Sequence, residues 1–394
     1  MFVLIDIVLL AGGALLSVLV AFLLAQIVAA VPSSGPSSMV DGGHPRIAVL
    51  VPAHDESSGM IPTLDSLRAQ LGPRDRCIVV ADNCTDDTAA VATSAGMVVL
   101  ERVDATRRGK GYALDFGVRA LAADPPDVVV VVDADCVLSA GALQRIAAIS
   151  QAHNRPVQAK YVMNAPKAAA GLSLIAEFAG RVKNRVRPLG SARLGLPCPL
   201  MGTGMAFPWT ILSSIDLASG HLVEDAMMSI DFTRAGYPPL YCDEASVITT
   251  MPASDEGAQS QRTRWEHGNL DMIVSVLPPL LLQGIRRGSW KQVGLAIDLL
   301  IPPLALLVLL VLAWFALCFV AFVLGAGLAP LVLMGLTALG LVSAVGFSWI
   351  RYGRDIVPLR MLALAPLYAL RKVPLYLKFL TRRQTEWVRS KRDA

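Results

Sequence analysis

The sequence has few charged residues and no pattern of paired cysteines. Only 17% of its 394 residues are charged, whereas 54% are hydrophobic, a composition on the apolar side of soluble proteins. The formal net charge of +4 is small, and no aromatic, base-stacking pattern accompanies the basic residues, so we exclude a nucleic-acid partner. The six cysteines form no Cys-x-x-Cys pair, which argues against a zinc site or a disulfide framework and favours a reducing cytoplasm.

Long apolar runs account for the shortage of charge. Residues 2–31 contain no Lys or Arg and exceed the roughly 20 residues that a helix needs to cross a bilayer. They lack the basic start and short apolar core of a signal peptide, so we predict a retained anchor. Residues 293–324 and 328–350 are also long enough to span, and a Pro-Pro pair is expected to kink the first of them. Residues 270–285 and 358–380 mix apolar and basic side chains, which is typical of helices at the membrane interface.

Between these apolar runs the sequence has an alternating α/β pattern. Residues 32–45 are rich in Pro, Ser and Gly and predict a linker. After the linker, short Val/Ile-rich runs alternate with longer helical patterns, which is typical of a parallel sheet with helices on both faces. We therefore predict the α/β class. The predicted strands are residues 47–51, 77–81, 97–100 and 128–132.

The strongest local signal is a run of five valines that ends in two carboxylates, Asp133 and Asp135. In open α/β sheets, ligands bind outside the carboxyl ends of the strands. Two carboxylates one residue apart can share a hard divalent cation, which can neutralise a pyrophosphate and help it to leave. The same side chains could instead cap the following helix, together with Ser139.

Polar residues also follow the first two predicted strands. Glu56 ends the segment Pro-Ala-His-Asp-Glu after the first strand, and Asp82 comes directly after the second. Carboxylates and exposed backbone at these positions could hold a base and a ribose, and Asp82 is suited to accept a hydrogen bond from a uracil N–H. For Asp86 and Asp87 a role in a turn or a helix cap is the simpler interpretation.

Lys110 stands between two glycines at the start of the next predicted helix. The glycines let the backbone approach an anion, while the ammonium group supplies positive charge. The Gly-x-x-x-x-Gly-Lys-Ser/Thr spacing of a Walker loop is missing, so we predict a phosphate-type site of another kind.

The motifs occur in a recognisable order. Pro-Ala-x-Asp-Glu, Asp-Asn-x-Thr-Asp, Gly-Lys-Gly, Asp-x-Asp, Glu-Asp and Gln-x-x-Arg-Trp follow one another between residues 47 and 265. This order resembles that of the inverting glycosyltransferases of family 2, above all the membrane-embedded, cellulose- and hyaluronan-synthase-like branch. The resemblance implies a GT-A nucleotide-sugar domain with a Rossmann-like, mostly parallel sheet, inserted between transmembrane helices and dependent on Mg²⁺ or Mn²⁺.

The resemblance also implies a role for each matching residue. Asp133 and Asp135 would hold the metal diphosphate, Asp225 would be the general base, and Glu224 would be its neighbour at the acceptor site. An arginine suits a bidentate phosphate contact and a tryptophan face suits a sugar ring. The nucleotide sugar would contact Pro52, Ala53, Glu56, Asp82, Lys110, Asp133 and Arg264, and the acceptor would contact Gln261 and Trp265.

Three positions depart from the family pattern. Asp55 stands where the family usually has Asn, Asn83 stands in place of the second residue of a double Asp, and Val223 replaces the usual Thr before Glu-Asp. The catalytic carboxylates are intact. The departures leave the nucleotide base open, with UDP preferred over GDP.

These observations predict an inverting glycosyltransferase of the inner or plasma membrane with a cytoplasmic catalytic domain. It would pass a sugar from a nucleoside-diphosphate donor to a lipid-linked or saccharide hydroxyl, in polysaccharide or glycolipid synthesis. Its other partners would be membrane lipids and a polysaccharide export protein. Two alternatives stay open: a polyprenyl-phosphate sugar synthase, and a catalytically idle scaffold that binds nucleotide sugar in a polysaccharide assembly complex.

The predicted organisation has six parts. Residues 1–31 form the transmembrane anchor, 32–45 the linker, 46–268 the GT-A domain, 269–292 an interfacial helix, 293–350 two transmembrane helices, and 351–394 a basic interfacial helix with a cytoplasmic tail.

This organisation predicts three spans, with the amino terminus outside the cytoplasm and the carboxyl terminus inside. Residues 351–394 contain 11 Lys or Arg against 3 Asp or Glu, and such an excess favours the cytoplasmic side. The first five residues and the short connection at 325–327 contain no Lys or Arg. Reporter fusions at both termini measure the orientation, and a carboxyl terminus found outside would refute the three-span arrangement.

Overall fold

The computed structural model of the chain describes residues 2–31, 43–166, 171–251, 255–381 and 383, except for the side chains of Ser58 and of residues 255–261. The chain forms two compact units, each with its own hydrophobic core. We call them the sheet unit, whose described residues are 43–166, 197–251 and 255–268, and the helical unit, whose described residues are 2–31, 171–196, 269–381 and 383.

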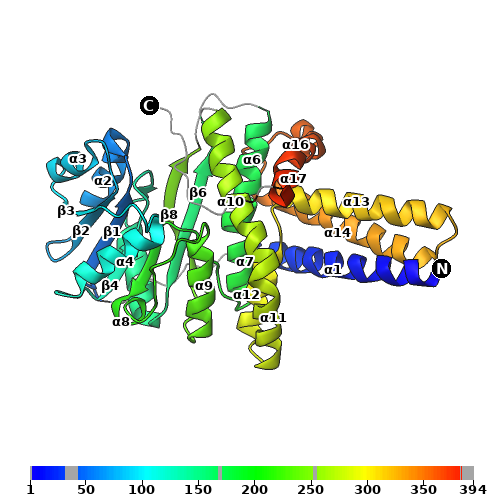
Figure 1. Cartoon of the computed structure of the whole chain (residues 1–394), viewed down its shortest axis with the longest axis horizontal. Coiled ribbons are helices and arrows are strands. Elements are labelled where there is room, and N and C mark those ends of the chain that lie inside the picture. The colour runs from blue at the N-terminus through cyan, green and yellow to red at the C-terminus, as the bar shows by residue number, and fades with distance from the viewer. Residues whose placement is uncertain (1, 32–42, 167–170, 252–254, 382, 384–394) are drawn as a thin grey trace. The chain divides into compact units, whose positions relative to one another are not determined.

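The sheet unit contains, within its described residues, one sheet of eight strands. These are β1 (Ile47–Ala53), β2 (Arg76–Asp82), β3 (Val98–Arg102), β4 (Val128–Val131), β5 (Val137–Leu138), β6 (Val157–Asn164), β7 (Met205–Pro208) and β8 (Leu240–Thr250). Their order is β3-β2-β1-β4-β7-β6-β8-β5. The four strands predicted from the sequence are neighbours and run parallel. β7 runs antiparallel to β4 and β6, and β5 runs antiparallel to β8. The predicted α/β fold with a mostly parallel sheet is confirmed (Figure 1).

Helices cover both faces of this sheet. They are α2 (Ile61–Arg68), α3 (Thr88–Ser94), α4 (Lys110–Leu121), α5 (Ala142–His153), α8 (Trp209–Leu212) and α9 (Glu224–Arg234), with a 3₁₀ turn at Ser57–Met60. α2, α3 and α5 pack on one face, and α4, α8 and α9 pack on the other. Alternate valines of β4 face different cores: Val130 belongs to the first and Val129 to the second. Such a strand offers room for a ligand only at its ends.

Among its described residues, the helical unit contains three helices that are long and apolar enough to cross a membrane, α1 (Phe2–Ala29), α13 (Leu304–Val323) and α14 (Leu328–Tyr352). They lie side by side in Figure 1 and share one core. The shorter helices are α6 (Leu172–Arg181), a π-helical turn (Val182–Val186), α7 (Arg187–Arg193), α11 (Leu277–Arg286), α12 (Trp290–Leu300), α15 (Leu359–Leu362), α16 (Ala365–Arg371) and α17 (Val373–Thr381). α10 (Asp255–Ser275) begins in the sheet unit and ends in the helical unit.

Two predicted details of the apolar segments change in the structure. Residues 293–324 do not form one kinked span, because the Pro-Pro pair separates α12 from α13. Proline cannot donate the backbone hydrogen bond that would continue a helix, so the chain breaks there. The helical segments Arg262–Ser275 and Leu277–Arg286 are together long and apolar enough to cross a membrane, with a bend of 45° between them. Up to four spans are therefore compatible with the described residues.

Within the helical unit, α7 makes a close contact with the end of α1. A β-carbon on Gly190 would lie far inside van der Waals contact of the Gln26 carbonyl oxygen. The buried Gln26 amide donates to Ser191 Oγ and to Asp298 Oδ1, at 2.7 Å in each case. Arg187 completes the group with a 2.7 Å ion pair to Asp298. The absent side chain at Gly190 is what lets these polar groups meet.

Gly190→Ala should destabilise the protein by about 1–3 kcal/mol, because the new methyl group has no space against backbone. Gly180→Ala in α6 is the matched control, since a β-carbon there meets nothing within 4 Å. That control should leave stability unchanged or raise it by up to about 1 kcal/mol, as alanine favours helix. Denaturant unfolding in detergent compares the two variants, and equal stabilities would contradict the close contact.

Candidate active site

Asp133 and Asp135 follow β4, with Val132 between the strand and Asp133. The backbone N–H of Asp133 donates to Thr203 Oγ1 at 3.0 Å, and the Asp135 carbonyl accepts from Thr249 Oγ1 at 3.1 Å. Ligand atoms of Asp133, Asp135 and Cys136 all lie within 4.8 Å of one another. Burial, reinforced by the two carboxylates, raises the pKa of the Cys136 thiol well above its ordinary value. The two carboxylates are therefore the ligands of this group that suit Mg²⁺ or Mn²⁺.

The alternative that these carboxylates cap the next helix is wrong. α5 begins at Ala142, and its N-cap is Gly141 in the left-handed conformation, with no side-chain cap. Ser139, the other proposed capping residue, instead accepts a hydrogen bond from the Ser246 N–H at 3.1 Å. Neither carboxylate is therefore used as a helix cap.

Lys110 contacts this carboxylate pair from the first turn of α4. Its ammonium group donates to Asp133 Oδ1 and, at 2.7 Å, to the Gly202 carbonyl oxygen. Burial alone would lower the pKa of Lys110, but the surrounding carboxylates, Asp133 first, outweigh burial and hold it above its ordinary value. Gly111 serves packing rather than an anion, because a β-carbon there would lie 2.5 Å from the Ser219 carbonyl oxygen.

Glu224 and Asp225 form the first turn of α9, where the helix dipole favours negative charge. A β-carbon on Gly202 would lie 3.3 Å from Lys110 Nζ and 3.5 Å from Asp225 Oδ2, so the lysine and the aspartate border the same glycine. Burial and the Asp225 charge raise the pKa of Glu224 to about 7, against the opposing charge of Lys110. The structure thus brings the Glu-Asp motif to the end of β4, although about 90 residues separate the two in sequence.

Asp82 lies at the end of β2 in a buried ion pair. Its Oδ1 accepts from Arg102 at 2.6 Å and from Asn83 Nδ2 at 3.0 Å. Its Oδ2 has no hydrogen bond within the described residues, so it can accept one from a base. The sequence analysis did not predict a role for Arg102. The signal for it was a basic residue at the end of β3, which is paired with the aspartate that ends β2.

The remaining predicted donor residues lie at the same end of the sheet. Pro52 and Ala53 end β1 and are paired with Val80 and Ala81 of β2. The backbone N–H of Glu56, just beyond the strand, donates to a threonine of α3 at 2.8 Å. The carboxyl ends of β1, β2 and β4 therefore carry all the predicted donor residues except Lys110 and Arg264.

The Gln-x-x-Arg-Trp motif lies on α10. A β-carbon on Gly268 would lie 2.8 Å from Val223 Cγ1, so this face of α10 packs on the residue before Glu224. Arg264 is one helical turn earlier and shares that face. Trp265 is partly buried, and the Gln261 side chain lies outside the described residues.

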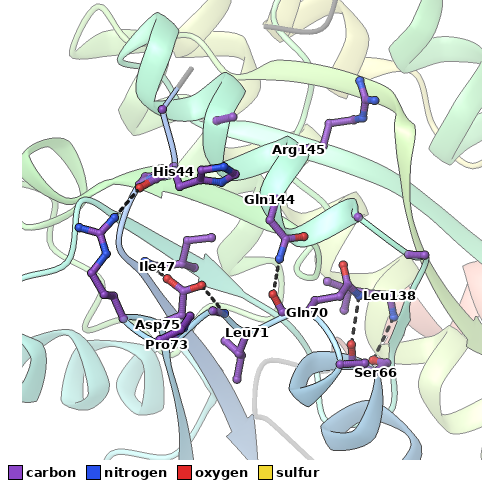
Figure 2. Close-up of a pocket in the computed structure, with 18 of the residues that line it drawn as sticks. His44, Ile47, Ser66, Gln70, Leu71, Pro73, Asp75, Leu138, Gln144 and Arg145 are labelled. Carbon is purple, nitrogen blue, oxygen red and sulfur yellow. Dashed lines mark hydrogen bonds between the residues drawn. The ribbon is translucent and has the colours of Figure 1, made fainter. Parts of the chain in front are cut away.

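A hollow of about 1000 Å³ lies at the opposite end of the sheet, beside the starts of β1 and β2 (Figure 2). Both Asp75 carboxylate oxygens are used there, one by the Ile47 N–H and one by the Gly72 N–H, at 2.8 Å each. Gln70 bonds to residues of α5. The Asp75 carboxylate in this hollow is therefore already occupied, and none of the predicted site residues lines the hollow. We place the candidate active site at the carboxyl ends of the strands instead.

Comparison with known proteins identifies the family of the chain. A sequence model of the family described as "Glycosyltransferase like family 2" matches residues 44–268. The mannosyltransferase PcManGT from Pyrobaculum calidifontis, solved with GDP-Man and Mn²⁺, is similar with 16% identity and a TM-score of 0.56, over 94% of this chain and 100% of that one. Glucosyl-3-phosphoglycerate synthase from Mycobacterium tuberculosis, solved with Mn²⁺, UDP and glucosyl-3-phosphoglycerate, is 21% identical over 60% of this chain and 86% of that one, with a TM-score of 0.39. No curated protein matches the sequence.

The family match covers more than half of the chain and includes every residue of the candidate site. The mixed α/β fold of the chain is shared with PcManGT. The chain belongs to the glycosyltransferase-like family 2 and is a glycosyltransferase with a GT-A nucleotide-sugar fold.

Proposed function

We propose that the chain is an inverting, metal-dependent glycosyltransferase of the cellulose- and hyaluronan-synthase-like branch that acts at the membrane. The observation that carries the proposal is the meeting of Lys110, Asp133 and Asp225 around Gly202. A carboxylate that can hold a metal diphosphate, a cation and a candidate base are the groups that transfer from a nucleoside-diphosphate sugar requires.

The proposed reaction is a single displacement. Asp225 accepts the proton of the acceptor hydroxyl, whose oxygen bonds to the anomeric carbon on the face opposite the diphosphate. The bond from that carbon to the diphosphate oxygen breaks, its electron pair leaves with the nucleoside diphosphate, and the configuration inverts. Lys110 and Arg264 balance the charge of the leaving group. A divalent cation held by Asp133 and Asp135 would neutralise the diphosphate.

The donor in this proposal is a UDP or GDP sugar, with UDP as the first candidate. Asp82 supports either base, because Arg102 occupies one carboxylate oxygen and leaves the other for a ring N–H, which uracil and guanine both present. The fold shared with PcManGT, which was solved with GDP-Man and Mn²⁺, supports a nucleotide-sugar donor and a divalent cation.

The acceptor in this proposal is a lipid-linked or saccharide hydroxyl at the membrane surface, with residues 46–268 in the cytoplasm. The three apolar helices support a membrane location. Three spans are few for a conduit that exports a growing polymer. We therefore infer either non-processive addition or dependence on an export protein, and purified protein that alone makes and translocates long polymer would contradict both.

Asp135→Ala should abolish sugar transfer and metal-dependent nucleotide binding, because Asp133 alone cannot hold both the cation and the diphosphate. Asp65→Ala is the matched control, since Asp65 is an exposed residue of α2 whose carboxylate pairs with Arg68, away from the candidate site. Radiolabel transfer and isothermal titration with Mn²⁺ measure both properties. Full activity of Asp135→Ala would end the assignment of the Asp-x-Asp motif.

Asp225→Asn should leave nucleotide-sugar affinity nearly unchanged and lower turnover by about 10²-fold or more, because the amide keeps the shape of the side chain but cannot accept the proton. Asp231→Asn, the same change two turns along α9, should leave both quantities unchanged. Binding by titration and kcat by product formation separate the two effects. Equal losses of affinity and turnover in Asp225→Asn would make Asp225 a structural residue.

A further inference from the structure

Gln158 of β6 is a fully buried polar residue that the reaction proposed above does not use. Its side-chain amide bonds to three backbone groups. The oxygen Oε1 accepts from the Met201 N–H at 2.8 Å, and Nε2 donates to the carbonyl oxygens of Thr203 at 2.9 Å and of Ala159 at 2.8 Å. Both protons of the amide group are therefore in use. Two of the bonds go to residues 201–204, which lead into β7 and which we call the glycine loop.

The glycine loop needs such bonds because it contains no regular secondary structure. Buried backbone groups outside helices and strands must find their partners elsewhere in the protein. Gly202 and Gly204 have φ angles of +87° and +63°, which few other residues adopt. The Gly204 carbonyl oxygen accepts from the Ala159 N–H at 2.8 Å. The side chain of Gln158 and the backbone of Ala159 therefore hold the loop on β6.

The glycine loop in turn holds two groups of the candidate active site. The Gly202 carbonyl oxygen accepts from Lys110 Nζ at 2.7 Å, and Thr203 Oγ1 accepts from the Asp133 N–H at 3.0 Å. The same ammonium group donates to Asp133 Oδ1. A continuous series of hydrogen bonds thus runs from Gln158 through the loop to the lysine and the first carboxylate of the Asp-x-Asp motif.

We propose that Gln158 is a positioning residue for sugar transfer: it fixes the glycine loop and, through the Gly202 carbonyl oxygen, holds the Lys110 ammonium group beside Asp133. The inference rests on the proposed function, in which Lys110 balances the charge of the diphosphate. A cation that is already in place loses less freedom when the donor binds, which strengthens binding. Without the Gln158 bonds, the carbonyl oxygen and the lysine would both be free to move.

The test is a double-mutant cycle on the full-length protein in detergent, with Gln158→Met and Lys110→Met made singly and together. Isothermal titration with UDP and with GDP, each with Mn²⁺, measures affinity. Methionine keeps the length of the glutamine side chain and removes its hydrogen bonds. Gln158→Met should lower affinity for the accepted nucleotide by about 3- to 30-fold. In the Lys110→Met background the factor should be at least about three times smaller, because the group through which Gln158 acts is gone.

Gln292→Met is the matched control. Gln292 of α12 is also a buried glutamine, and its Nε2 donates at 3.0 Å both to the Leu280 carbonyl oxygen and to Gln283 Oε1. These bonds lie within the helical unit and touch none of the candidate site residues. The control removes comparable hydrogen bonds and should leave nucleotide affinity within about 2-fold. Denaturant unfolding compares the stability of the two variants.

The outcomes distinguish this inference from the function on which it rests. Wild-type protein that binds neither nucleotide with Mn²⁺ would contradict the proposed function itself. Wild-type protein that binds, with the same factor for Gln158→Met in both backgrounds, would overturn only the role of Gln158. An equal loss of affinity in Gln292→Met would overturn it too, since the effect would then be a general loss of stability. Unchanged affinity in Lys110→Met would remove the lysine from the proposed site and overturn the inference with it.

Gln158→Glu provides a second cycle if Gln158→Met folds poorly, because glutamate has nearly the shape of glutamine. Its ionised carboxylate would face the carbonyl oxygens of Thr203 and Ala159, whereas the protonated form can donate to one of them. Relative to wild type, the affinity loss should therefore be larger at about pH 8 than at about pH 6, since burial raises the pKa of a carboxyl group. This pH difference should disappear in the Lys110→Met background. Its absence in the single variant, or its persistence without the lysine, would overturn the inference.

Discussion

The complete burial of β4 and the residue after it, on both faces of the sheet, is the constraint on which the active site depends. Residues 128–132 are at most 2% exposed. A carboxylate within this run would lose its hydration without a partner, at a cost of several kcal/mol. The first acidic side chains therefore come where the chain leaves the core. The parallel strands on one side of β4 end at the same edge, which gathers polar residues from distant parts of the sequence.

Several carboxylates at this edge of the sheet surround the ammonium group of Lys110. Asp133, Glu224 and Asp225 all act on one ammonium group, that of Lys110. Burial and the charge of Asp225 raise the pKa of Glu224, although the charge of Lys110 opposes them. A divalent cation would add positive charge at the carboxylate pair, and the diphosphate would bring negative charge only together with that cation.

Local patterns in the sequence predicted much of this site, whereas long-range pairing was beyond them. The valine run and the two carboxylates that follow it are local, so β4 and its end could be predicted. β7 was not predicted, because it is a short strand placed antiparallel beside β4 by tertiary pairing. The same holds for Arg102, because its ion pair with Asp82 depends on β2 and β3 being neighbours. The break between α12 and α13 was missed as a boundary because a Pro-Pro pair can either bend or end a helix.

The contact between Lys110 and Asp133 has a thermodynamic consequence. A cation that binds Oδ1 of Asp133 competes with an ammonium group already in place, and the Gly202 carbonyl oxygen holds that group from the other side. A metal ion that takes this oxygen without a diphosphate must displace the lysine, which weakens metal binding. The metal ion together with a diphosphate offers the lysine new oxygen atoms in exchange. Such an arrangement couples the two ligands, so that each raises the affinity for the other by the same factor.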